Sequence, residues 1–148
     1  MTNPYKMFQT NRDAEKEGIL VNYGDFRFKV ARAGGGNSRF RKLLQAKLKP
    51  YRHQLDNETM DEQVSEQLMR EAFAETVVVG WESKVTDEAT GLSRWEPWLD
   101  TPDGRLEFSV ENCVKVLTDL PDLFRDLQQV ANKVALYRKT EEDEDAKN

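Results

Sequence analysis

Two short stretches near the start of the chain alternate apolar and polar residues. The first stretch covers residues 19–23, the second covers residues 26–31, and Gly24-Asp25 lies between them. Period-two alternation on both sides of a turn that contains Gly-Asp predicts a β-hairpin, which we place at residues 18–32. A two-stranded hairpin is only marginally stable alone, so we expect it to pack on another element.

Later stretches of the chain have apolar residues at helical spacing. Pro50 should break the first helix, because proline cannot continue a helix interior. Thr59-Met60-Asp61-Glu62 matches a capping box at the start of the second helix, which should end at Gly80. Ser109 is expected to cap the third helix. The predicted helices cover residues 37–49, 60–79, 110–119 and 121–139.

The segment of residues 81–108 differs in character, since it holds all three tryptophans together with two prolines and two glycines. We expect a loop or loose hairpin whose tryptophans cover the helical core, with a short strand over residues 104–108. Residues 1–12 should form an extended arm, followed by one helical turn that stops at Gly18.

The fold class that these patterns predict is α+β and mainly α. An N-terminal β-hairpin packs on about four helices, and residues 1–140 form a single α-rich domain. The remaining segment, residues 141–148, begins with five consecutive acidic residues and should be a disordered tail.

Composition places the chain among charge-rich proteins with a modest core, because 33% of its residues are charged and its formal net charge is -5. No apolar run approaches the roughly 20 residues that span a bilayer, and the first residues contain no apolar signal region. The single cysteine, Cys113, fits a reducing compartment. We therefore expect a cytoplasmic protein without membrane association.

Positive charge is concentrated in residues 26–55, which hold nine of the 22 basic residues and none of the 27 acidic ones. Such a block can contact an acidic partner or a phosphate backbone, or it can neutralise acidic helices of this same chain. Its aromatic residues fall on the predicted apolar faces, which favours core packing over nucleic-acid binding. The candidate basic surface consists of Arg39, Arg41, Lys42, Lys47, Lys49 and Arg52.

Residues suited to catalysis are few. His53 is the only histidine, and no serine lies in a Gly-x-Ser-x-Gly context. Gly34-Gly35-Gly36 completes no phosphate-binding motif, which favours a hinge or tight loop. Glu82 and Lys84 have the Glu-x-Lys spacing of some metal-dependent nucleases, but such a site also needs an upstream acidic residue on a neighbouring strand, and the preceding 20 residues are predicted to be helical. We predict no enzyme activity, no catalytic or metal site and no cofactor.

Two apolar stripes are candidates for binding a helix of a partner. One follows the predicted helix 121–139 at spacings of four and three residues, and the other follows the helix 60–79. Stripes of this kind also bury each other as a core, and that alternative stays open. The candidate partner-binding residues are Leu123, Leu127, Val130, Val134, Met60, Val64 and Leu68.

Several segments of the chain resemble the tail assembly chaperones of long-tailed bacteriophages. Together they cover most of residues 13–148, and none of them is a catalytic motif. The Trp-rich segment 81–100 matches least well. The resemblance rests on Glu15 to Asn37, on Lys49-Pro50-Tyr51-Arg52, on Phe108-Ser109-Val110-Glu111-Asn112, on Leu120-Pro121-Asp122-Leu123-Phe124 and on the acidic end Glu141 to Asn148.

The resemblance implies an assembly factor without enzyme activity that works in the cytoplasm of the host cell. Family members bind the tape measure protein and keep it soluble until tail tube subunits polymerise around it, and they are typically absent from the finished virion. Many are made in two lengths by ribosomal frameshifting, which leaves open a longer product that reaches the tail tube protein. Self-association, a structural tail or connector subunit, and a nucleic-acid-binding module through residues 26–55 stay open as alternatives.

Overall fold

The predicted N-terminal hairpin is present in the structure, a computed structural model that describes residues 2–138. β1 (Ile19–Asn22) and β2 (Phe26–Val30) pair in antiparallel fashion. Gly24 has a φ of 101°, a left-handed conformation that favours glycine. Its amide donates to Oδ1 of Asn22 at 2.7 Å. This turn fixes the register that sends alternate side chains of β2 into the core.

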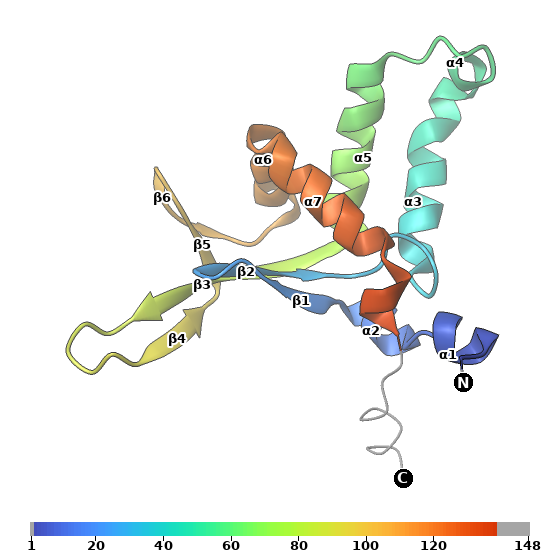
Figure 1. The fold of residues 1–148 in the computed structure, drawn as a ribbon. Coiled ribbons are helices and arrows are strands. Elements are labelled where there is room, and N and C mark those ends of the chain that lie inside the picture. The colour runs from blue at the N-terminus through green and yellow to red at the C-terminus, as the bar shows by residue number, and fades with distance from the viewer. Residues whose placement is uncertain (1, 139–148) are drawn as a thin grey trace.

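The hairpin is half of a larger sheet and does not stand alone. Four strands pair in the order β1-β2-β3-β4, where β3 is Val78–Thr86 and β4 is Ser93–Glu96. A separate two-stranded sheet pairs β5 (Trp98–Thr101) with β6 (Gly104–Glu107). The outer parts of β3 and β4 extend away from the helices as an arm (Figure 1).

Of the two structures expected over residues 81–108, a loop or a loose hairpin, the hairpin is confirmed, because β3 pairs with β4 and β5 with β6. The short strand expected near the end of the segment is present as β6. The helix expected through residue 79, by contrast, ends early, at Thr76, and Gly80 pairs with Lys29 inside the sheet. Three consecutive β-branched residues, Val77-Val78-Val79, favour an extended backbone. The free edge of β2 supplies their hydrogen-bond partners, which helical periodicity cannot reveal.

Four principal helices occupy the predicted positions, and the structure confirms the α+β class. α3 and α5 stand side by side and rise from the same side of the sheet on which α6 and α7 lie (Figure 1). The predicted acidic tail, residues 141–148, and the domain boundary at residue 140 lie outside the described residues. The four helices are α3 (Ser38–Leu48), α5 (Glu62–Thr76), α6 (Val110–Asp119) and α7 (Pro121–Asn132).

Most of the predicted helix boundaries follow local chemistry. Pro50 ends α3, which continues as the short 3-10 helix η1 (Lys49–Tyr51) and then as α4 (Arg52–Asp56). Ser109 caps α6, because its Oγ accepts a hydrogen bond from the amide of Asn112 at 3.0 Å. These boundaries depend on residues within one turn of the helix end, and they were predictable for that reason.

Two further boundaries differ from prediction. The capping box at residues 59–62 is not formed, because Asp61 is the N-cap of α5 and accepts from the amide of Gln63 at 2.8 Å. The helix expected over residues 121–139 stops at Asn132, and a short 3-10 helix, η2 (Val134–Tyr137), follows. η2 ends where the hydroxyl of buried Tyr137 donates to a backbone carbonyl of β2 at 2.9 Å, so a tertiary contact replaces the last helical turns.

The N-terminal arm is helical where an extended chain was expected. α1 (Pro4–Phe8) is capped by Asn3, and α2 (Arg12–Glu17) ends at Gly18 as predicted. Both short helices lie beside η2 at the base of the molecule (Figure 1). The start and the end of the described chain therefore meet, and Thr10 and Arg138 form a β-bridge there.

A buried carboxylate joins α2 to the triple-glycine loop. Glu15 is 1% exposed and lies 2.5 Å from Arg32 Nη1 and 2.6 Å from Thr10 Oγ1. Burial by itself would raise the pKa of Glu15, but the hydrogen bonds from Thr10, Arg32 and the Gly36 amide, with the charge of Arg32, hold the pKa below its ordinary value. A Cβ at Gly35 would collide with this carboxylate, and Gly35 has a φ of 52°, so this packed loop requires glycine.

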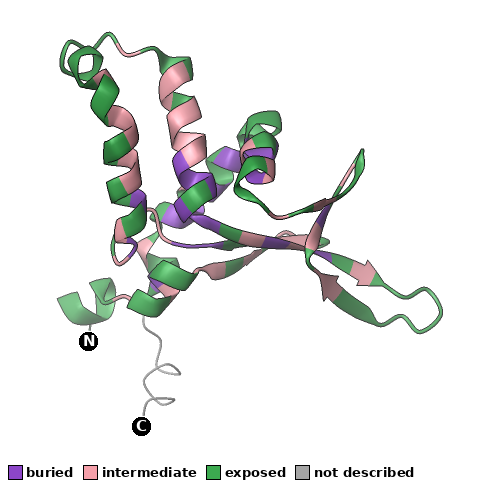
Figure 2. Ribbon diagram, turned by 180° about the vertical axis from the view of Figure 1, so that it is seen from behind, coloured by how far each residue is buried: buried purple, intermediate pink, exposed green. Residues whose placement is uncertain are grey.

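The hydrophobic core lies where the helices meet the sheet, while the far turns of α3 and α5 are half-buried or exposed (Figure 2). Phe73 of α5 is at its centre, in edge-to-face contact with Phe40 at 5.4 Å and with Phe124 at 5.3 Å between ring centroids. Phe28 and Trp81 supply the sheet side of the same cluster. This core holds α6 and α7 above the sheet and leaves an open groove beside them.

Candidate functional site

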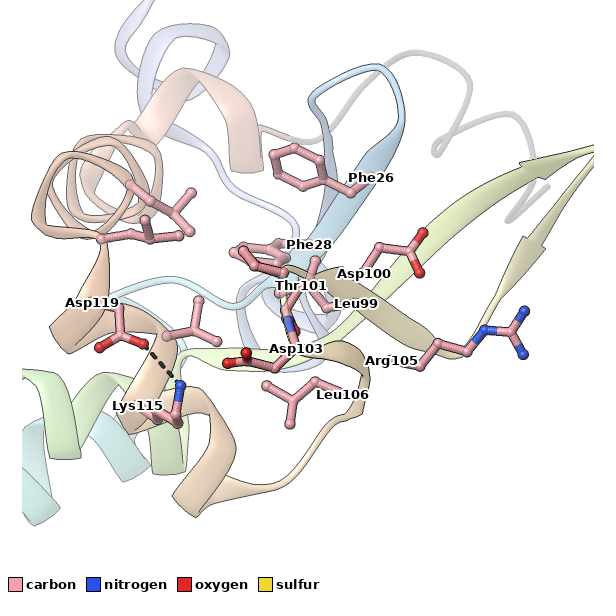
Figure 3. Close-up of a pocket in the computed structure, with 14 residues that line it drawn as sticks. Phe26, Phe28, Leu99, Asp100, Thr101, Asp103, Arg105, Leu106, Lys115 and Asp119 are labelled. Carbon is pink, nitrogen blue, oxygen red and sulfur yellow. Dashed lines mark hydrogen bonds and ion pairs between the residues drawn. The ribbon is translucent and has the colours of Figure 1, made fainter.

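An apolar groove of about 440 Å³ opens between β2, the β5–β6 hairpin, α6 and the start of α7 (Figure 3). Its floor is formed by Phe28, Leu99 and Val116, which are each less than 9% exposed. Its walls are formed by partly exposed or exposed apolar side chains. The wall residues are Phe26, Leu106, Leu120 and Leu123.

Hydrogen bonds to β3 hold the β5–β6 hairpin in position over the groove. The indole nitrogen of Trp81 donates to the carbonyl of Leu106 at 3.0 Å. The buried hydroxyl of Ser83 accepts from the amide of Asp100 at 3.1 Å. In both hydrogen bonds the donor and the acceptor lie on strands, so β3 holds this wall of the groove in place.

The opposite wall is fixed by contacts between the first hairpin and α7. The hydroxyl of Tyr23 hydrogen-bonds to the carboxylate of Asp126 on α7. The ring of Tyr23 also stacks on Phe26, with centroids 5.1 Å apart. Phe26 is thereby held at the mouth of the groove, where its ring is labelled in Figure 3. The groove is thus largely preformed, which reduces the entropy lost when a ligand enters.

Charged side chains surround the apolar floor. Asp100 and Asp103 stand on the β5–β6 hairpin, and Lys115 and Asp119 stand on α6 (Figure 3). Lys115 Nζ lies 3.0 Å from Asp119 Oδ2, and this hydrogen bond raises the pKa of Lys115. An apolar floor with a charged rim suits an amphipathic helix, whose apolar side chains enter while its polar flanks stay in water.

The predicted partner-binding residues of the stripe along residues 121–139 separate into three places in the structure. Leu123 lines the groove. Leu127 and Val130 are buried in the chain's own core, at 0% and 9% exposure, which removes them from any surface that a partner could reach. Val134 falls in η2, after α7 has ended, and is half-buried. The stripe along residues 121–139 is therefore not continuous, because α7 turns its middle residues inward.

The other predicted stripe stands apart from the groove. Met60 precedes α5, and Val64 and Leu68 lie on its first turns, where the side chains are half-buried. Helix α3 runs alongside α5 (Figure 2). None of these three residues lines the groove.

The predicted basic surface covers α3, η1 and the start of α4. Two of its members bond to α5: Lys47 pairs with Glu71 at 3.3 Å, and Arg39 donates to a carbonyl at 3.3 Å. Internal neutralisation thus accounts for part of the positive block. The four other members are exposed and form no ion pair within residues 2–138; they are Arg41, Lys42, Lys49 and Arg52.

The residues considered for catalysis do not come together. Glu82 and Lys84 do lie on a strand, but Glu82 pairs with Arg27 at 2.8 Å. His53 is exposed on α4, and burial raises the pKa of the Cys113 thiol to about 12. Within residues 2–138, no three His, Cys, Asp or Glu side chains gather as a metal site would require.

Sequence reasoning identified one groove residue as a binding candidate, Leu123. It also predicted a turn at Pro102-Asp103-Gly104 and the strand after it, but it assigned no strand to residues 98–101. Leu99 and Leu106 flank this turn symmetrically and pair with each other, which was a signal for the β5–β6 hairpin. The position of the hairpin beside α6 had no such signal, because it depends on contacts with β3.

Comparison with known proteins identifies a family. None of the helices in the described part of the chain is both long and apolar enough to cross a membrane. Neither the curated protein sequences nor the solved structures contain a significant match to this chain. Residues 35–148 match the family model described as YdaY prophage protein, a span that includes most of the groove. The chain is therefore phage-derived and belongs to the YdaY prophage protein family.

Proposed function

We propose that this protein is a phage tail assembly chaperone that binds the tape measure protein and keeps it soluble while the tail tube assembles. The observation that carries the proposal is the preformed apolar groove with its charged rim. Membership of a prophage family and the resemblance of several segments to tail assembly chaperones support it. The protein then acts in the host cytoplasm by binding alone, with no cofactor and no chemical step.

The physical basis is the solubility of the client. A tape measure protein presents long amphipathic helices, and their apolar stripes aggregate when they are not covered. The groove offers the half-exposed side chain of Leu120 and its neighbour Leu123 to such a stripe. Covering apolar surface on both partners contributes roughly 25 cal/mol per Å² before the cost of association is subtracted. A factor that is released during assembly must bind reversibly.

Co-expression with the tape measure protein tests the proposal. Leu123→Gln removes an apolar group from the groove without changing charge, and glutamine is a good helix former at this position in α7. Leu92→Gln is the matched control, because Leu92 is 72% exposed on the loop between β3 and β4 and does not line the groove. Soluble client and its co-purification are the two quantities measured.

We expect the unmodified protein and the Leu92→Gln variant to keep the client in the supernatant, and the Leu123→Gln variant to lose most of it to the pellet. A client that stays soluble without the chaperone, or that all three chains protect equally, contradicts the proposal. Detection of the chain at stoichiometric amounts in purified virions would favour the structural tail or connector subunit. A longer frameshifted product would appear as a second, larger band in the co-purified material.

A further inference from the structure

We infer that the groove selects amphipathic helices whose apolar stripe is flanked by lysine or arginine. The inference rests on the proposed function and concerns the same groove. The observation behind it is an imbalance of charge among the side chains that line the groove, where three carboxylates meet two cations. The carboxylates belong to Asp100, Asp103 and Asp119, and the cations are Lys115 and Arg105.

The second cation near the groove does not correct this imbalance. The guanidinium of Arg105 lies 4.2 Å from the ring centroid of Trp98, and it points away from the groove (Figure 3). Lys115 is already bonded to Asp119 at 3.0 Å. Asp100 and Asp103 form no ion pair within the described residues. Asp100 lies directly opposite Arg105 in the hairpin register and is partly balanced by it, so Asp103 is the carboxylate on this wall with most of its charge left for a partner.

The backbone adds to the negative potential on the other wall. Asp119 is the last residue of α6, and a helix C-terminus carries a partial negative charge. An apolar helix that enters the groove passes between this end of α6 and the hairpin that bears Asp100 and Asp103. Basic residues beside its apolar stripe would reach both walls, whereas acidic residues would be repelled from both. The charges at the rim therefore determine which helices bind, and the apolar floor provides most of the binding free energy.

Two synthetic peptides of about five helical turns test this selection. Both carry the same leucine stripe, flanked by lysines in one peptide and by glutamates in the other. We expect the full chain to bind the lysine peptide about tenfold more tightly or better in fluorescence anisotropy, and the difference to shrink at high salt. The variant Asp100→Lys with Asp103→Lys should lose or reverse the preference, and the milder Asp100→Asn with Asp103→Asn should reduce it.

The matched control is Glu17→Lys with Glu88→Lys, which changes the net charge equally at two exposed carboxylates that do not line the groove. The control should keep the preference. Equal affinity for both peptides, no binding of either, or a preference that the Asp100 and Asp103 variants leave intact overturns the inference. The co-expression assay distinguishes failure of this inference from failure of the proposed function. If the Asp100 and Asp103 variants still protect the client and only Leu123→Gln loses protection, the chaperone proposal stands and the charge-based selection is wrong.

Discussion

Leu120 offers a test in which stability and client binding should respond differently. It joins α6 to α7 as the N-cap of α7, where its side chain makes no capping hydrogen bond, and it is 50% exposed in the groove wall. Asparagine is among the best N-cap residues and is similar in size to leucine. Leu120→Asn therefore adds a cap to the helix while it places an amide in the groove.

The expected change in stability is small because two terms oppose each other. A good N-cap contributes about 1 kcal/mol. Loss of the buried half of a leucine side chain costs about 1 kcal/mol, half of the value for full burial. The free energy of unfolding should therefore stay within about 1 kcal/mol of the original, and the melting temperature within about 4 °C.

The expected change in binding is much larger. A client helix that covers the exposed half of Leu120 gains roughly 1 kcal/mol from it, and an amide left unpaired there costs about 2 kcal/mol more. The sum of about 3 kcal/mol corresponds to an affinity on the order of 100-fold weaker. Calorimetric titration with a soluble tape measure fragment and a thermal melt of the free chaperone measure the two quantities.

Two results would refute this reasoning. An unchanged affinity in a variant of unchanged stability shows that the client does not contact the groove. A melting temperature lowered by more than about 10 °C shows that Leu120 is a core residue whose packing the capping argument underestimates. Leu92→Gln again serves as the control, since Leu92 is an exposed leucine outside the groove.

The remaining predictions concern the buried carboxylate, the core and the basic surface. Because the pKa of Glu15 in the folded state lies below its ordinary value of 4.5, the unfolded chain takes up the proton first as the pH falls. The stability that Glu15 contributes is therefore present above about pH 4.5 and is lost as the pH falls through the folded-state pKa. The free energy of unfolding in urea should change less between about pH 7 and about pH 4 in Glu15→Gln than in the original chain, and an equal change in both chains would contradict this prediction. Leu127→Ala should lower the free energy of unfolding by about 2 to 5 kcal/mol, because Leu127 is fully buried. Leu123→Ala should lower it by only about 1 kcal/mol, because Leu123 is half-buried, and equal losses would show that both residues belong to the core. Lys49→Glu with Arg52→Glu should leave elution from immobilised DNA unchanged at moderate salt, and earlier elution of this variant would support the nucleic-acid-binding alternative.

The sequence predicted those features of the fold that neighbouring residues control. The turn at Gly24, the break at Pro50 and the cap at Ser109 are all present. Each arises from the φ preference or the hydrogen-bonding capacity of a residue within about one helical turn of the feature, so no distant contact has to be known. The pattern of apolar spacing likewise located the four main helices and the first hairpin.

The candidate site was less predictable because it is assembled from segments that are distant along the chain. Periodicity gives each helix an apolar face, but it does not say what covers that face. Leu123 and Leu127 belong to the same stripe, one turn apart, yet the first lines an open groove and the second is completely buried. Only the position of α7 relative to the sheet separates their roles.

The sequence by itself determined which local structures this chain can form, because turns, caps and helix breaks are properties of short segments. The tertiary structure decided between structures that the local segments permit. Val77-Val78-Val79 continues the apolar pattern of a helix, although its β-branched residues favour a strand, and pairing with the free edge of β2 made it a strand. The side chains of Trp81 and Ser83 on β3 then hydrogen-bond to the backbone of β6 and β5, and these contacts hold the hairpin over a groove that no single segment encodes.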